Sequence, residues 1–202
     1  AGTTISVDQA VGVTIENLAV LGLASGGGTT ALINASQSVD CDFSRLVVVA
    51  AATADATSAA IGLSGLMLDC AIRDCTLVAE QGVSVIAGER GYLLAVGLRV
   101  VDNLIFCSQR GIRLDGMTLH YGETRVAGNL LLACAQGAVT LLGGAFPAAT
   151  VTVEGNVMHV SGAGVRAGID GLRIADNEMV SVPSRVPADA IYRFVLDSDD
   201  GS

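Results

Sequence analysis

The side chains best suited to chemistry follow glycine-led apolar segments of the chain. Arg113 and Asp115 come after Gly111, and Arg166 comes after Gly164 in the same way. Residues two apart in a β-strand point to the same side of a sheet, so Arg113 and Asp115 are expected to share a face. Arginine can neutralise an acidic sugar while a base removes the proton beside the sugar carboxylate. Arg113, Asp115 and Arg166 are therefore candidate catalytic residues for a lyase-type reaction.

Loops beyond these segments add polar and aromatic side chains to the candidate site. His120 and Tyr121 follow the Gly111 segment directly, and either of them could serve as the base. Tyr121, Arg90 and Asp170 are also candidate ligand-binding residues, because elaborated loops on one edge of a repeat structure commonly build a binding site.

Catalysis makes demands that this set of residues meets only in part. A calcium-dependent lyase needs several carboxylates around the cation, and Asp115 alone is clearly placed on the face. A hydrolase needs two acids about 5–10 Å apart, whereas neighbouring repeats offer Ser84 and Thr140 at the equivalent outward positions. The chain also contains no Trp on which a sugar could stack. These features favour binding over turnover; no cofactor is expected, and Ca²⁺ only if the chain is a lyase.

The elements that position these residues belong to an internal repeat. An apolar residue, two mostly polar residues, a key position, one spacer and a second apolar residue recur along the chain. The key position falls at Leu18, Leu46, Cys75, Asn103, Asn129, Asn156 and Asn177, with spacings of 21 to 29 residues. A period of this length is typical of a solenoid. We predict an all-β, right-handed parallel β-helix of a single chain, with about seven turns and three short strands in each turn.

A tight corner is expected at each key position, in the fourth repeat at Asp102 and Asn103. Asn tolerates the left-handed backbone conformation that a sharp corner requires. We expect the last four key residues to stack from turn to turn as a structural ladder. Arg99, Arg125, Thr152 and Arg173 precede the corners as an outward strip, which we interpret as a solvated face.

This pattern resembles the right-handed parallel β-helix repeat of the pectate-lyase-like superfamily. The matching residues are the ladder Asn103, Asn129, Asn156 and Asn177 with the strands beside them, and the resemblance extends over about residues 5–196. The first three repeats depart from it because they lack the Asn. The resemblance implies the fold, but that superfamily contains lyases, hydrolases, esterases and epimerases as well as rods and adhesins, so fold alone does not select a function.

Composition narrows the class of protein. The net charge is −9, and all the basic residues are Arg. An acidic chain without a basic patch argues against nucleic acid as a partner. No stretch of about 18 apolar residues occurs, so no membrane span is expected. We predict one domain over residues 1–202 with a loose acidic tail at 197–202, and we favour an extracellular or cell-surface location.

The five cysteines show no metal-binding spacing. Cys41 and Cys70 occupy the same inward position in consecutive turns, where stacked strands about 4.8 Å apart would permit a disulfide. We favour reduced cysteines that act as small core residues.

Both ends of the repeat are expected to expose strand edges, at Ile5–Val7 and Ile191–Leu196. Exposed edges invite pairing, so flanking domains of the same chain or a capping subunit are expected partners, and self-association is a further possibility. The sequence therefore favours a non-catalytic β-helix structural or binding module of a larger exported, surface or phage-like protein, with a glycan as a possible ligand. The alternative is a polysaccharide lyase or related carbohydrate-active enzyme that acts on acidic glycans.

Overall fold

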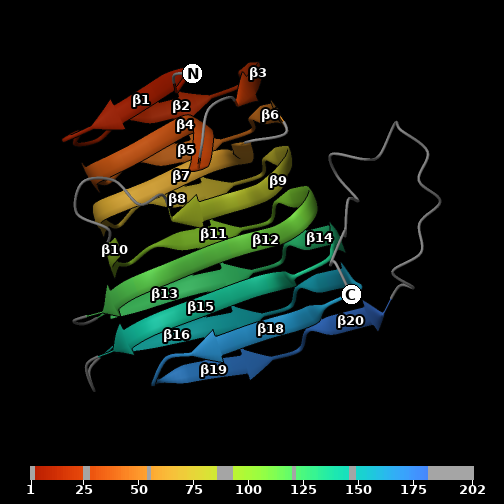
Figure 1. The fold of residues 1–202 in the computed structure, drawn as a ribbon. Coiled ribbons are helices and arrows are strands. Elements are labelled where there is room, and N and C mark those ends of the chain that lie inside the picture. Colours follow the sequence, from red (N-terminus) through yellow and green to blue (C-terminus); the bar gives the residue numbers. More distant parts are fainter. Residues whose placement is uncertain are drawn as a thin grey trace.

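The computed structural model describes residues 3–24, 28–53, 56–85, 93–119, 122–145 and 149–181. These residues form an all-β parallel solenoid whose layers follow one another from the N-terminal to the C-terminal end (Figure 1). Within the same ranges, no helix has the length and apolar character needed to cross a membrane. The predicted fold class is therefore confirmed.

One face of the coil is a seven-stranded sheet of short strands. Its members are β2 (Thr14–Glu16), β5 (Asp42–Ser44), β8 (Ala71–Arg73), β11 (Arg99–Val101), β13 (Gly122–Ala127), β16 (Ala149–Glu154) and β19 (Leu172–Ala175). Each strand pairs in parallel with the equivalent strand of the next repeat, for example Val100 with Ile72 on one side and with Val126 on the other.

The remaining strands belong to one thirteen-stranded sheet that bends around the rest of the coil. They are β1 (Ile5–Asp8), β3 (Ala19–Ala24), β4 (Gly28–Val39), β6 (Val47–Ala52), β7 (Ala56–Leu68), β9 (Thr76–Val85), β10 (Leu93–Val96), β12 (Leu104–Leu119), β14 (Leu130–Cys134), β15 (Gly137–Ala145), β17 (Val157–Val160), β18 (Ala163–Gly168) and β20 (Glu178–Ser181).

Three separate strands per turn were expected, but several turns join two of them. In β12, 16 residues run past the corner without a break. The pairing register with β9 shifts between Cys107 and Arg110, which marks a β-bulge. A bulge bends a strand and leaves one residue unpaired, so the chain changes face here without ending the strand.

The coil makes about five turns, fewer than the seven expected. Each repeat contributes one strand to the seven-stranded sheet, but a complete turn also needs strands in the thirteen-stranded sheet. The last repeat supplies only β19 and β20 within the described residues. Counting repeats overestimates the turns because it includes end layers that do not close.

The interior is a narrow column of aliphatic side chains drawn from all faces of the coil. In the turn that begins at β11, Val100, Ile105 and Ile112 are fully buried. Small residues such as Ala50 and Ala79 are buried beside them and keep the cross-section thin. Repetition of this layer provides burial that no single repeat could achieve alone.

The predicted asparagine ladder is confirmed. Asn129 accepts hydrogen bonds at Oδ1 from the backbone N and the side-chain Nδ2 of Asn103, at 3.1 and 2.9 Å. Asn129 Nδ2 in turn donates to Asn156 Oδ1 at 2.9 Å, and Asn156 Nδ2 donates to Asn177 Oδ1 at 2.8 Å. Asn103, Asn129 and Asn156 are at most 2% exposed, so these bonds satisfy polar groups that water does not reach.

The left-handed backbone conformation was assigned to the wrong corner residue. The residue before each ladder Asn has the positive φ: Asp102 (+56°), Gly128 (+64°), Gly155 (+59°) and Asp176 (+53°). This arrangement leaves the Asn side chain free to turn inward along the stack. The glycines at two of these corners were the available sequence signal, because Gly adopts positive φ without steric cost.

Candidate functional site

Three arginines gather on the outer side of the thirteen-stranded sheet. Arg110 and Arg113 lie on β12 and Arg166 lies on β18, and Arg113 is in register with Thr140 of β15, which is in register with Arg166. Adjacent strands are about 4.8 Å apart, so two layers separate Arg113 from Arg166 by about 10 Å. We call Arg110, Arg113, Arg166 and Asp115 the arginine face.

The carboxylate of the arginine face is held by its neighbour. Arg113 Nε donates to Asp115 Oδ2 in an ion pair, and the two side chains are 30% and 26% exposed. The other oxygen, Asp115 Oδ1, is buried and has no hydrogen-bond partner among the described residues. The predicted proximity of Arg113 and Asp115 is therefore seen as a direct contact.

Burial and the surrounding charges both act on the pKa of Arg110. Burial lowers the pKa of the Arg110 guanidinium, and repulsion from Arg113 and Arg166 lowers it further, while attraction to Asp115 opposes the change. Arginine stays protonated at any physiological pH. The arginine face is therefore a local excess of positive charge on a chain whose net charge is −9.

Two outward positions beside the arginines are covered, contrary to expectation. Ser84 is 0% exposed and Thr140 is 3% exposed. Ser84 Oγ donates to Gln81 Oε1 at 2.6 Å, and Gln81 is in register with Arg110. These hydroxyl groups therefore do not present a polar surface to solvent.

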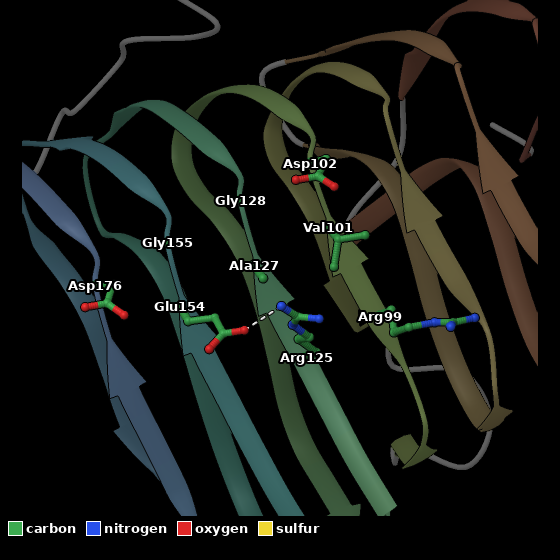
Figure 2. Close-up of a pocket in the computed structure, with 9 residues that line it drawn as sticks. All are labelled: Arg99, Val101, Asp102, Arg125, Ala127, Gly128, Glu154, Gly155 and Asp176. Carbon is green, nitrogen blue, oxygen red and sulfur yellow. Dashed lines mark hydrogen bonds and ion pairs between the residues drawn. The ribbon is translucent and has the colours of Figure 1, made fainter.

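A second polar surface lies at the asparagine corners, on the seven-stranded sheet (Figure 2). This corner groove has a volume of about 390 Å³. Its lining residues are Arg99, Val101, Asp102, Arg125, Ala127, Gly128, Glu154, Gly155 and Asp176. A Cβ atom added to Gly155 would meet nothing within 4 Å, so the missing side chain leaves the floor of the groove open.

Charges in the corner groove are largely matched. Arg125 Nη2 lies 2.5 Å from Glu154 Oε1. Figure 2 shows this pair side by side, with the Arg99 side chain extending away from it and with Asp102 and Asp176 along the groove. The predicted outward register of Arg99, Arg125, Thr152 and Arg173 is seen, although Thr152 is only 5% exposed.

The remaining candidate residues are not brought into either surface by the described structure. His120, Tyr121 and Arg90 lie outside the described residues. Asp170 is exposed in the turn after β18, and the described residues record no ion pair for it. In the same part of the chain, no group of three or more His, Cys, Asp or Glu side chains is arranged to hold a metal ion.

Sequence reasoning missed Arg110 as a member of the site. The register shift between Cys107 and Arg110 brings Arg110 opposite Gln81, and a repeat period cannot reveal a bulge. The available signal was the glycine that follows, because Arg110 directly precedes Gly111 at the corner.

Comparison of the chain with protein-family models, with curated proteins and with solved structures finds no match. The assignment of a parallel β-solenoid with a stacked asparagine ladder therefore rests on the structure alone.

Proposed function

We propose that this chain is a non-catalytic β-helix module that binds an acidic polymer, with a glycan carrying carboxylate or sulfate groups as the favoured ligand. The observation that supports the proposal is the arginine face, where Arg113 pairs with Asp115 and the charges of Arg113 and Arg166 act on the neighbouring Arg110. Guanidinium groups bind carboxylate and sulfate through paired, charge-assisted hydrogen bonds.

The solenoid suits a linear ligand because it holds its side chains on a rigid ladder of strands. The backbones of Arg113 and Arg166 are fixed by strand pairing through Thr140, so little backbone conformational entropy is lost when they bind. The rest of the chain is acidic and repels polyanions, which restricts binding to the local excess of positive charge.

Binding is favoured over turnover because the Asp115 carboxylate is already engaged in an ion pair with Arg113. Its Oδ2 accepts from Arg113 Nε, so the carboxylate serves to orient the guanidinium. A general acid or base must instead be free to reach a proton of the substrate. Membership of the pectate-lyase-like superfamily, and a place in a larger exported, surface or phage-like protein, belong to this proposal.

A glycan panel tests the proposal. Purified protein is titrated calorimetrically with polygalacturonate, with a sulfated glycan and with a neutral glucan, and each mixture is then analysed for shortened or unsaturated chains. We expect binding to the acidic polymers, weakening as salt rises, and no change in the polymers. Binding to the neutral glucan alone, or to none of the three, would contradict the proposal.

A polysaccharide lyase is the second candidate, favoured by one specific observation. Asp115 Oδ1 is buried without a partner among the described residues, on the same face as the arginines. A substrate hydroxyl would satisfy that oxygen if the substrate displaced the groups that now cover it. The appearance of an unsaturated uronate product, with or without added Ca²⁺, would replace the binding module with the enzyme.

A further inference from the structure

Two buried cysteines meet across adjacent layers of the coil. Cys107 Sγ lies 2.6 Å from Cys134 Sγ, and both residues are 0% exposed. Two unbonded sulfur atoms do not normally approach so closely, and a covalent S–S bond measures about 2.0 Å. The interior thus places these two sulfur atoms within reach of a covalent bond.

A backbone irregularity creates this encounter. Phe106 pairs with Leu132, so the next residues in register would be Cys107 and Ala133. Ala133 instead has φ of +63°, and the pairing of β14 with β17 shifts between Leu131 and Cys134. The extra residue turns Cys134 inward, above Cys107. A strict repeat would have placed Ala133 there, which is why the sequence pointed to Cys41 and Cys70.

We propose that Cys107 and Cys134 form a disulfide that staples two consecutive layers of the coil. The strands that carry them are about 4.8 Å apart, within the Cα separation of about 4.4–6.8 Å that disulfides span. The oxidant is a low-molecular-weight disulfide such as oxidised glutathione. Two thiols lose two protons and two electrons, one S–S bond forms between the Sγ atoms, and the oxidant is reduced to two small thiols.

The bond forms while the chain folds, because the folded coil shields both thiols. Thiol–disulfide exchange requires a thiolate and access for the oxidant. Burial, together with Cys134, raises the pKa of the Cys107 thiol well above its usual value. A chain folded under reducing conditions should therefore resist later oxidation, whereas a chain folded with the oxidant should contain the staple.

The other cysteines contact the main chain. Cys70 Sγ lies 3.4 Å from the carbonyl oxygens of Ser38 and Leu68, and burial, with a smaller contribution from the neighbouring Cys41, raises its pKa to about 11. Cys75 Sγ lies 3.2 Å from the carbonyl oxygen of Arg73. Cys41, Cys70 and Cys75 are buried and serve as internal controls for the selectivity of oxidation.

The chain is well suited to a direct test because trypsin separates all five cysteines. Because the chain contains Arg but no Lys, cleavage places Cys41, Cys70, Cys75, Cys107 and Cys134 in the peptides 1–45, 46–73, 74–90, 100–110 and 126–166. The whole chain is unfolded, refolded with oxidised and reduced glutathione, alkylated in denaturant and digested. We expect mass spectrometry to detect peptide 100–110 linked to peptide 126–166, with the other three peptides alkylated.

Two outcomes would overturn the staple. One is alkylation of both Cys107 and Cys134 after oxidative refolding, and the other is a link between Cys41 and Cys70 in their place. A second measurement covers stability: the oxidised chain should unfold about 5–10 °C above the reduced chain, and Cys134→Ala should abolish that difference while Cys41→Ala preserves it. Binding of acidic polymers is measured in a separate titration, so the absence of this disulfide would not contradict the binding role proposed for the arginine face.

Discussion

The arginine face and the corner groove both align arginines along the coil, but the first carries excess positive charge and the second does not. Each aligns arginines through strand pairing: Arg113 and Arg166 lie two layers apart with Thr140 between them, whereas Arg99 and Arg125 lie on adjacent layers. In the groove, Glu154 matches Arg125, and two further carboxylates line the same hollow. In the arginine face, burial and then repulsion from Arg113 and Arg166 lower the pKa of Arg110, while Asp115 opposes the change. Stacking alone therefore does not create an anion site; the balance of charges does.

The largest effect is expected from removing the ladder that supports both surfaces. Asn129→Ala leaves the backbone N–H of Asn103 and the carbonyl of Val100 without the partners seen at 3.1 and 2.9 Å. Each buried polar group left unpaired costs about 1–3 kcal/mol, so we expect a loss of about 3–5 kcal/mol in the free energy of unfolding. Urea denaturation measures this loss in the free energy of unfolding. A loss below about 1 kcal/mol would mean that the ladder contributes little to stability.

Two glycines distinguish the scaffolds beneath the two surfaces. A Cβ at Gly111, below the arginine face, would lie 2.6 Å from the carbonyl oxygen of Ala138, whereas a Cβ at Gly155 in the groove would meet nothing within 4 Å. We expect Gly111→Ala to cost about 2–3 kcal/mol by overpacking. Gly155→Ala should cost only about 1 kcal/mol, from its positive φ. Equal losses in paired urea titrations would contradict this difference.

Reversing charges tests which surface binds. The double substitution Arg113→Glu and Arg166→Glu should weaken affinity for polygalacturonate by at least about 100-fold, since hydrogen bonds to charged groups contribute about 1.5–3 kcal/mol for each arginine lost. The matched double substitution Arg99→Glu and Arg125→Glu changes the net charge equally and should weaken binding less than about threefold, through long-range repulsion alone. Isothermal calorimetry at fixed salt compares them, and the reverse ranking would move the site to the corner groove.

The smallest effect is expected from a substitution that makes the charge of the corner groove more like that of the arginine face. Glu154→Gln removes the carboxylate that matches Arg125 while keeping its shape. We expect the affinity of the chain for the acidic polymer to rise by no more than about threefold, because exposed ion pairs contribute about 0–1 kcal/mol. The same calorimetric titration measures the gain. A tenfold gain would show that counterion matching is the only difference between the two surfaces.

The sequence predicted the parts of this molecule that repetition controls. The ladder of Asn103, Asn129, Asn156 and Asn177 and the shared side of Arg113 and Asp115 follow from a constant period and from strand alternation. The failures lie where the period is broken locally. A β-bulge shifts the register before Arg110 and brings it opposite Gln81. The positive φ of Ala133 lets Cys134 occupy the inward position that the repeat assigns to Ala133.

Burial of polar groups was the other property that periodicity could not supply. Ser84 occupies an outward position in the repeat, yet it is fully buried and donates to Gln81. Whether an outward hydroxyl meets solvent depends on the side chains that surround it in space, and no repeat register encodes them. For the same reason Asp115 Oδ1, which has no hydrogen-bond partner among the described residues, could be recognised only in three dimensions.

The most direct test of the binding proposal observes the guanidinium groups themselves. In a ¹⁵N-labelled chain of 20.4 kDa, the arginine Nε–Hε signals are recorded while a short oligogalacturonate is added. We predict shifts at Arg110, Arg113 and Arg166 that saturate together, with Arg99 and Arg125 unchanged. Shifts confined to Arg99 and Arg125, or the absence of any saturable shift, would contradict the assignment of the arginine face as the binding surface.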